Sequence, residues 1–236
     1  MINYVFIKNI NYMKTLVKVL VLFITTTIIA QKPIEKSIGE FNELKVYDLI
    51  EVKLIKSNEN KVIISGKKSE SVVINNKNGT LKIKMKFKEI FDGNDTKVTL
   101  HYKTLDIIDV NEGATVASTD EIKQYEIDLK AQEGGIIKVP INVTYTNIKA
   151  VTGGIIEVKG ISKSQNISLL TGGIYKAEHL QTEKTDVSIN AAGEAYVKAS
   201  KVVDVKVRAG GDVFIYGHPE TVNESTILGG RVKRMD

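Results

Sequence analysis

After residue 30, apolar and polar residues alternate in short runs, and many of these runs flank a pair of glycines. The segments "AVTGGIIEV", "LLTGGIYKA" and "VRAGGDVFI" are three examples. Alternation with a period of two is typical of a β-strand that buries one face. Long amphipathic helical patterns are missing from this part of the chain, so the pattern predicts an all-β protein.

The glycine pairs recur about every 19 residues, which indicates a repeat architecture. Aligning the repeats on one glycine gives Gly113, Gly135, Gly154, Gly173, Gly193, Gly211 and Gly230. Six residues before this glycine the residues are Ile107, Leu129, Ile148, Ile167, Val187 and Val205. Five before it they are mostly Lys or Ser, and four before it mostly apolar again. The first repeat departs from this order, which predicts a one-residue slip there.

If each repeat is one coil, equivalent residues stack at the strand spacing of about 4.8 Å. The aliphatic columns then face the interior, and glycine makes a corner that a side chain would obstruct. We therefore expect a parallel β-solenoid with coils of about 19 residues. An antiparallel sandwich whose hairpins recur at this interval is the alternative.

Residues 31–105 lack the glycine pairs but keep the strand pattern. Two alternating runs flank "SNEN", and another pair flanks Asn78-Gly79, a strong hairpin signal. We expect hairpins or irregular coils here that cover the first rung, because an open solenoid end needs a cap. Residues 106–236 are expected to form the glycine-marked coils, continuous with residues 31–105.

The N-terminus has the features of a secretory signal peptide over residues 1–30. The run "VLVLFITTTIIA" follows Lys14 and Lys18 and ends at Ala30, and Met13 is the more natural start of such a signal. The apolar run is too short to span a bilayer, which needs about 20 residues. We expect an exported protein in the periplasm, on the outer-membrane surface or outside the cell, with no transmembrane span in the mature chain.

Charge and cysteine content exclude several classes of function. The net charge of +5 falls to +2 without residues 1–30, so basicity gives no argument for a nucleic-acid partner. The chain has no cysteine, which excludes disulfides and thiol chemistry.

The order of these segments resembles a known family. "FNELKVYDLIEVKLIKSNENKVIISG", "NGTLKIKMK", the glycine coils and "GGDVFIYGHPETV" are similar to the putative auto-transporter adhesin head domain, the GIN domain. The resemblance covers Phe41 to Asp236. It implies a right-handed parallel β-helix in an exported bacterial protein, with no catalytic residues to transfer. Glu224 departs from the pattern because it stands at an expected inward position.

No cofactor, metal or catalytic motif stands out. The glycine pairs form neither a dinucleotide nor a phosphate-binding motif, and the three histidines lack ligand spacing. Glu157, Glu194 and Asp212 are outward carboxylates, but no recognisable catalytic set surrounds them. A carbohydrate-active enzyme on a β-helix therefore stays an alternative that rests on fold analogy.

An outward aromatic column is the candidate binding site. Tyr196 and Phe214 occupy the same position on neighbouring coils, and Tyr216 follows two residues later. Exposed aromatic rings can bind a sugar or a protein partner, or they can stabilise the sheet as a cross-strand pair. We expect a non-catalytic surface or periplasmic binding module that recognises a glycan or an envelope protein. A purely structural envelope protein is a further alternative.

The signal peptide generates the first testable prediction. Mass spectrometry of the exported protein should show a mature chain that begins near Gln31 or Lys32. Recovery of the intact segment from Met13 to Ala30 in the envelope fraction would instead identify a membrane anchor.

Overall fold

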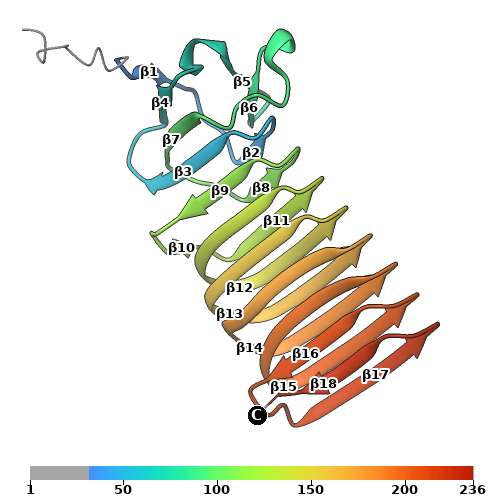
Figure 1. Cartoon of the computed structure of the whole chain (residues 1–236). Coiled ribbons are helices and arrows are strands. Elements are labelled where there is room, and N and C mark those ends of the chain that lie inside the picture. Colours follow the sequence, from blue (N-terminus) through green and yellow to red (C-terminus); the bar gives the residue numbers. More distant parts are fainter. Residues whose placement is uncertain (1–31, 236) are drawn as a thin grey trace, which may run out of the picture. The chain divides into compact units, whose positions relative to one another are not determined.

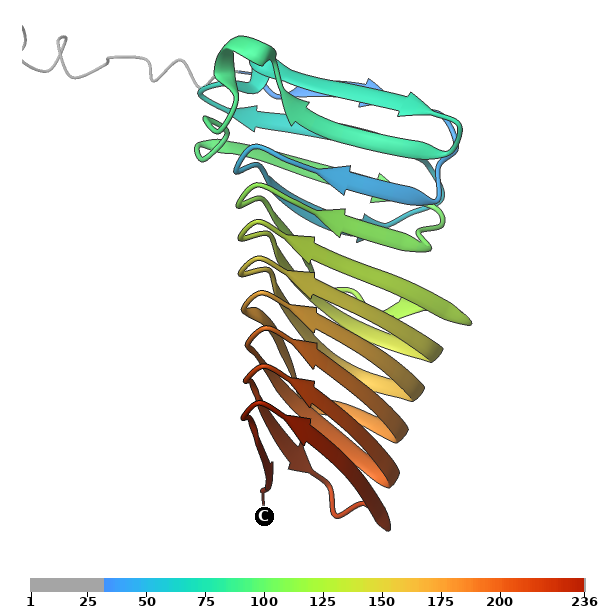
Figure 2. The ribbon, with the colours of Figure 1, turned by 90° about the vertical axis from the view of Figure 1, so that its right-hand side faces the viewer.

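The computed structural model describes residues 32–235, and the described residues from Pro33 onward form one compact unit built of stacked coils (Figure 1, Figure 2). The predicted signal peptide lies outside these residues. The N-terminal strands are β1 (Ile34–Ser37), β2 (Glu43–Val46), β3 (Glu51–Lys56), β4 (Lys61–Gly66), β5 (Val72–Lys77), β6 (Thr80–Met85) and β7 (Thr96–Tyr102). Two short 3₁₀ turns, η1 (Ser69–Ser71) and η2 (Phe87–Glu89), lie among them.

The remaining strands build the column of coils. They are β8 (Ile107–Val110), β9 (Thr115–Ser118), β10 (Ile122–Lys123), β11 (Glu126–Gln132), β12 (Ile136–Val151), β13 (Ile155–Leu170), β14 (Gly173–Asn190), β15 (Gly193–Arg208), β16 (Asp212–Tyr216), β17 (Thr221–Ile227) and β18 (Arg231–Arg234). Among residues 32–235 there is no helix long and apolar enough to cross a bilayer.

Successive coils pair in parallel and in register, which confirms the solenoid and excludes the antiparallel sandwich. Ile148 of β12 pairs with Ile167 of β13, which pairs with Val187 of β14. These residues are at most 3% exposed, and the residues directly before and after each of them point outward. The interior is therefore the predicted set of aliphatic columns, and neighbouring coils share one continuous core.

The slip predicted in the first repeat is confirmed. Ile108, rather than Ile107, pairs with Leu129 in the inward column. The corner explains the shift, because Ala114 occupies the place that Gly135 takes in the next coil: the N–H of Ile136 donates to the Ala114 carbonyl. Gly113 is thus equivalent to the first glycine of the later pairs.

The corners at Gly135, Gly154 and Gly173 require this second glycine because neighbouring coils approach closely there. A Cβ on Gly154 would lie 2.1 Å from the carbonyl oxygen of Ala131 in the preceding coil. The two residues before it, Thr152 and Gly153, have φ of 49° and 71°, which turns the chain in two residues. The strands bend without such a turn on the other side of the coil, so each coil has one tight corner and one wide bend (Figure 2).

The wide bends hold polar residues inside the column, a feature that the aliphatic pattern does not predict. Tyr175 is fully buried, and its hydroxyl donates to Gln165 Oε1 at 2.7 Å. Gln165 Nε2 donates to Thr185 Oγ1 at 2.9 Å, which lies 2.9 Å from Thr182 Oγ1. Burial raises the pKa of Tyr175, so its hydroxyl stays protonated and serves as a donor.

The region before residue 106 contributes two rungs and the cap. Strands β2 and β3 pair in parallel with β8 and β9, and β6 and β7 pair in parallel with β2 and β3. Strands β5, β4 and β1 then add antiparallel strands at this end of the solenoid. The hairpin at Asn78-Gly79 is confirmed by the β5–β6 pairing, but β3 and β4 are not neighbours, because β7 lies between them.

At the other end, Glu224 in β17 pairs with Val205 of the inward column. Glu224 is exposed there, since no coil among the described residues covers it. The departure seen in the sequence therefore marks the last rung of the core.

The column assignment can be tested by a pair of adjacent substitutions. Ile167→Asp places a charge inside the core and should lower the free energy of unfolding by several kcal/mol. Ser168→Asp, whose side chain faces outward, should change it by less than about 0.5 kcal/mol. Chemical denaturation of both variants measures the difference, and equal losses would contradict the assignment of inward and outward positions.

Candidate functional site

The predicted aromatic column lies on the sheet face that follows the corners. Tyr196 of β15 pairs with Phe214 of β16, and their rings stack with centroids 4.6 Å apart and planes 13° apart. Tyr216 follows on the same face, opposite Lys198. The three rings point outward and are half-buried. The structure thus brings the three residues together as one surface feature.

The contacts of this column decide which parts of the rings reach solvent. One face of the Tyr196 ring and one face of the Phe214 ring contact each other. Lys233, on the next rung, places its Nζ 5.9 Å from the centroid of the Phe214 ring. The hydroxyl of Tyr196 donates to Glu194 Oε2 at 3.0 Å, and this hydrogen bond raises the pKa of Tyr196. A ligand would therefore meet ring edges and tyrosine hydroxyls rather than a flat aromatic surface.

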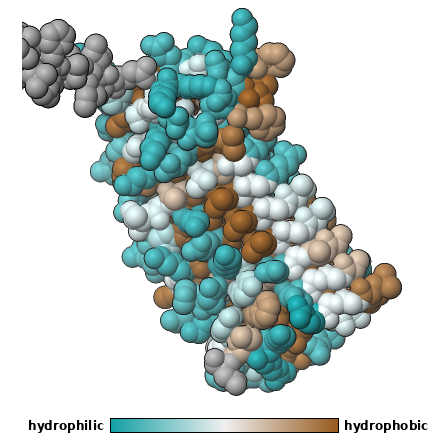
Figure 3. Space-filling view, viewed as in Figure 1, coloured by the Kyte–Doolittle hydropathy of each residue, from teal (hydrophilic) through white to brown (hydrophobic). Residues whose placement is uncertain are grey.

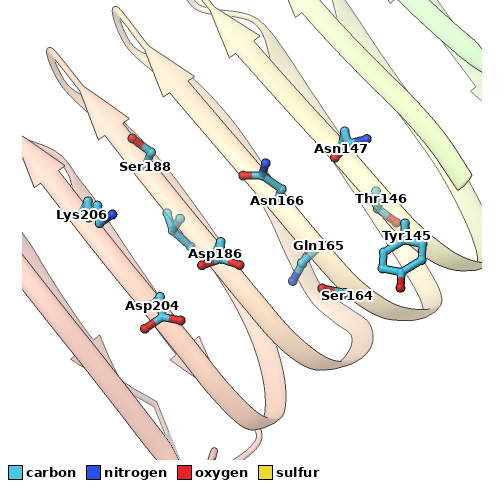
Figure 4. Close-up of a pocket in the computed structure, with 11 residues that line it drawn as sticks. Tyr145, Thr146, Asn147, Ser164, Gln165, Asn166, Asp186, Ser188, Asp204 and Lys206 are labelled. Carbon is cyan, nitrogen blue, oxygen red and sulfur yellow. The ribbon is translucent and has the colours of Figure 1, made fainter.

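A second surface feature lies on the opposite sheet face, before the corners. It is an open groove of about 410 Å³ across β12, β13, β14 and β15 (Figure 4). The side chains Asn147, Asn166, Asp186 and Asp204 run across the four strands in one row, and we call this row the amide–carboxylate ladder. Ser188 and Lys206 form a shorter row beside it.

Hydrogen bonds occupy the two ends of the ladder and leave its middle free. At one end Asn147 Nδ2 donates to Asp128 Oδ1 at 2.9 Å. At the other, Asp204 Oδ1 accepts from Asn223 Nδ2 at 2.8 Å. Within residues 32–235, the exposed side chains of Asn166 and Asp186 have no hydrogen-bond or ion-pair partner. The middle of the groove therefore offers amide donors and acceptors, and carboxylate acceptors, to a ligand.

Two tyrosines border the groove at its N-terminal end. Tyr145 lines the groove and is 42% exposed, and Tyr125 packs edge-on against it with centroids 5.3 Å apart. The proximity of Tyr145 raises the pKa of Tyr125. A tyrosine combines an apolar ring with a polar hydroxyl, which suits a ligand that has apolar faces and hydroxyl edges.

The sequence reasoning missed the amide–carboxylate ladder, although a signal for it was present. Each ladder residue stands seven positions before the second glycine of its corner, the same offset on every coil. The alternation of apolar and polar residues predicts only which positions face inward. The shared offset and the similar polar side chains of these outward residues are the signal that predicts the ladder.

The outward carboxylates considered for catalysis all have side-chain partners on the same strand or a neighbouring one. Glu157 pairs with Lys138 at 3.3 Å, and Asp212 accepts from Arg231 Nε at 2.8 Å. The Arg231 guanidinium lowers the pKa of Asp212. Glu194 accepts the Tyr196 hydroxyl, as described above. In the described part of the chain, no three His, Cys, Asp or Glu residues are grouped so that they could hold a metal ion.

The fold and these surfaces define a class: a β-solenoid that displays regular columns of outward side chains on two faces. The chain belongs to the family described as "Putative auto-transporter adhesin, head GIN domain", whose model matches residues 40–219. This confirms the family expected from the sequence. No curated protein matches the chain at a significant level.

Solved structures with the same fold come from species of Bacteroides and Parabacteroides. A putative adhesin from Bacteroides fragilis has a TM-score of 0.79 and 18% identity, over 87% of this chain and 98% of its own. A putative adhesin from Parabacteroides distasonis has a TM-score of 0.65 and 21% identity, over 86% and 96%. A putative lipid binding protein from the same species has a TM-score of 0.60 and 19% identity, over 87% and 98%. At these identities the likeness shows the fold alone.

Proposed function

We propose that this protein is an exported, non-catalytic adhesion module that binds a glycan at the bacterial envelope. The observation that carries the proposal is the amide–carboxylate ladder, whose free middle lies in a groove bordered by tyrosines. The family membership supports a role in adhesion, and the predicted signal peptide supports export to the periplasm, the outer-membrane surface or the medium.

The chemistry of the groove favours a glycan over an envelope protein. Protein interfaces bury a largely apolar centre and exclude charged residues from it. Here the centre of the groove carries Asn166 and Asp186, and the large exposed ring, Tyr145, stands at one end. Sugar hydroxyls can satisfy these polar groups, and the apolar face of a sugar ring can lie on a tyrosine.

The repetition of the ladder favours a polymer over a single sugar. Equivalent side chains recur at the strand spacing of about 4.8 Å, so an extended chain can form similar contacts on several rungs. Contacts that are weak individually then add within one molecule, which raises the affinity without any new type of contact.

The arrangement of the carboxylates favours binding without cleavage. Glycosidases place two carboxyl groups on opposite sides of the scissile bond. Asp186 and Asp204 instead project from the same flat sheet face on neighbouring strands (Figure 4). A glycan lying on the ladder would therefore have both carboxylates on one side.

A double substitution in the middle of the ladder tests this function. Asn166→Ala with Asp186→Ala should lower the affinity for glycans identified on an array by about tenfold or more, because hydrogen bonds to sugar hydroxyls are lost. The control, Lys138→Ala with Glu157→Ala, removes an exposed ion pair on the opposite face, away from the aromatic column, and should leave binding unchanged. Binding to no glycan on the array, or cleavage of a bound glycan, would contradict the proposal.

The aromatic column is a second candidate surface, favoured by its half-exposed Tyr216 and tyrosine hydroxyls. If it contributes to binding, replacing Tyr196, Phe214 and Tyr216 with Ala should reduce affinity by about five- to thirtyfold per lost aromatic anchor. Binding is measured at matched folded concentration, with the melting temperature recorded for both proteins. Unchanged affinity with a lower melting temperature would show that the rings stabilise the sheet and do not bind the ligand.

A further inference from the structure

The corner between β6 and β7 differs from the short corners of the column. Residues 86–95 form an extended loop there, which begins with the turn η2. It presents three large apolar side chains to solvent: Phe87 is 89% exposed, Phe91 59% and Ile90 42%. Figure 3 shows a group of hydrophobic side chains at the upper right, over this part of the molecule. We call this loop the apolar tip.

The apolar tip is held in place by buried and paired groups. Asp48 is only 3% exposed, and its carboxylate accepts the N–H of Met85 at 2.9 Å and the N–H of Phe91 at 3.1 Å. On the other side of the loop Lys68 pairs with Glu89 at 3.2 Å and with Asp92. The structure thus fixes both ends of the segment that carries the exposed rings.

The backbone of Phe91 adds to this picture. Its φ is 58°, a left-handed conformation that bulky residues rarely adopt. Burial does not compensate for the unfavourable conformation, because most of the ring is in solvent. The hydrogen bond from the N–H of Phe91 to Asp48 holds this conformation, which keeps a large apolar ring at the surface.

A row of lysines lies beside the apolar tip. Lys82, Lys84, Lys86 and Lys88 are all exposed, and none forms an ion pair with an acid within residues 32–235. The first three line a groove of about 590 Å³ together with Phe87 and Ile90. Glu112 and Asp48 also line this groove, and burial and the neighbouring Asp48 raise the pKa of Glu112.

We propose that the apolar tip is a docking site for an anionic lipid bilayer. Aromatic and aliphatic side chains enter the boundary between headgroups and acyl chains, and each lysine beside them is attracted to anionic headgroups. Neither signal alone gives stable membrane binding, but an apolar insertion and a basic row together do. The free lysines complement the negative charge of an acidic lipid surface. The exposed rings favour a bilayer over a soluble polyanion, because only the bilayer has an apolar interior in which they can be buried.

Tryptophan fluorescence tests this site within the full chain, because the sequence contains no tryptophan. The vesicles contain phosphatidylcholine with about 30% phosphatidylglycerol, an anionic lipid that gives them a negative surface. These vesicles should shift the tryptophan emission of the Phe87→Trp variant to shorter wavelength. Vesicles of phosphatidylcholine alone should produce little shift. Adding Lys→Gln substitutions at 82, 84, 86 and 88 should weaken the apparent affinity by at least about a hundredfold.

Two controls separate the apolar tip from the rest of the chain, including the hydrophobic N-terminal segment. Leu228→Trp places the probe at an 85% exposed corner at the C-terminal end of the coils and should show no shift. Lys→Gln substitutions at 149, 163, 184 and 206 remove the same charge from exposed positions elsewhere and should leave the Phe87→Trp response unchanged. No shift with anionic vesicles, an equal shift at position 228, or a shift produced only by a soluble acidic polysaccharide would overturn the proposal.

Discussion

The close approach of neighbouring coils at the tight corner is the constraint on which the rest of this structure depends. At Gly135, Gly154 and Gly173, an added Cβ would lie 2.1 to 2.2 Å from a carbonyl of the preceding coil. Since the coils touch there, a shift of one coil against the next would lose the backbone pairing on both faces. The corner therefore holds the register, and register converts a sequence offset into a straight column of side chains.

The same constraint explains both kinds of surface on the coils. Outward residues with the same offset from the corner lie next to one another on successive coils, so they form a straight column of side chains. Tyr196 and Phe214 stack because they share one such position, and Asn166 and Asp186 stand side by side because they share another. In the stacked pair each ring covers one face of the other. In the middle of the ladder the polar groups face solvent, which is why the proposed ligand is placed there.

Much of the fold follows from the sequence, because inward columns and corner glycines are local signals. The slip in the first repeat was visible in the exchange of Ile107 for Ile108, and its cause is Ala114 at the second glycine position. The rung formed by β2 and β3 was not visible, since its corner is made by Asp48 and Leu49 with φ of 62° and 61° instead of by glycine. The buried hydrogen bonds of Tyr175 also escaped prediction, because the polar partners Gln165 and Thr185 come from different coils.

The candidate sites show where such reasoning ends. The ladder follows the period of the repeat, so the sequence contains enough information to predict it. The apolar tip lies outside the period of the repeat. The conformation of its segment "KMKFKEIF" depends on hydrogen bonds to Asp48, nearly forty residues earlier in the sequence. In a solenoid each coil contacts only its neighbours, and the tip belongs to the rung of β6 and β7 while the groove begins at β12. Three rungs, whose strands before the corner are β2, β8 and β11, therefore separate β6 from the groove. A change at the tip should alter attachment to lipid without altering the groove, so the fold allows a membrane contact and a glycan contact to vary independently.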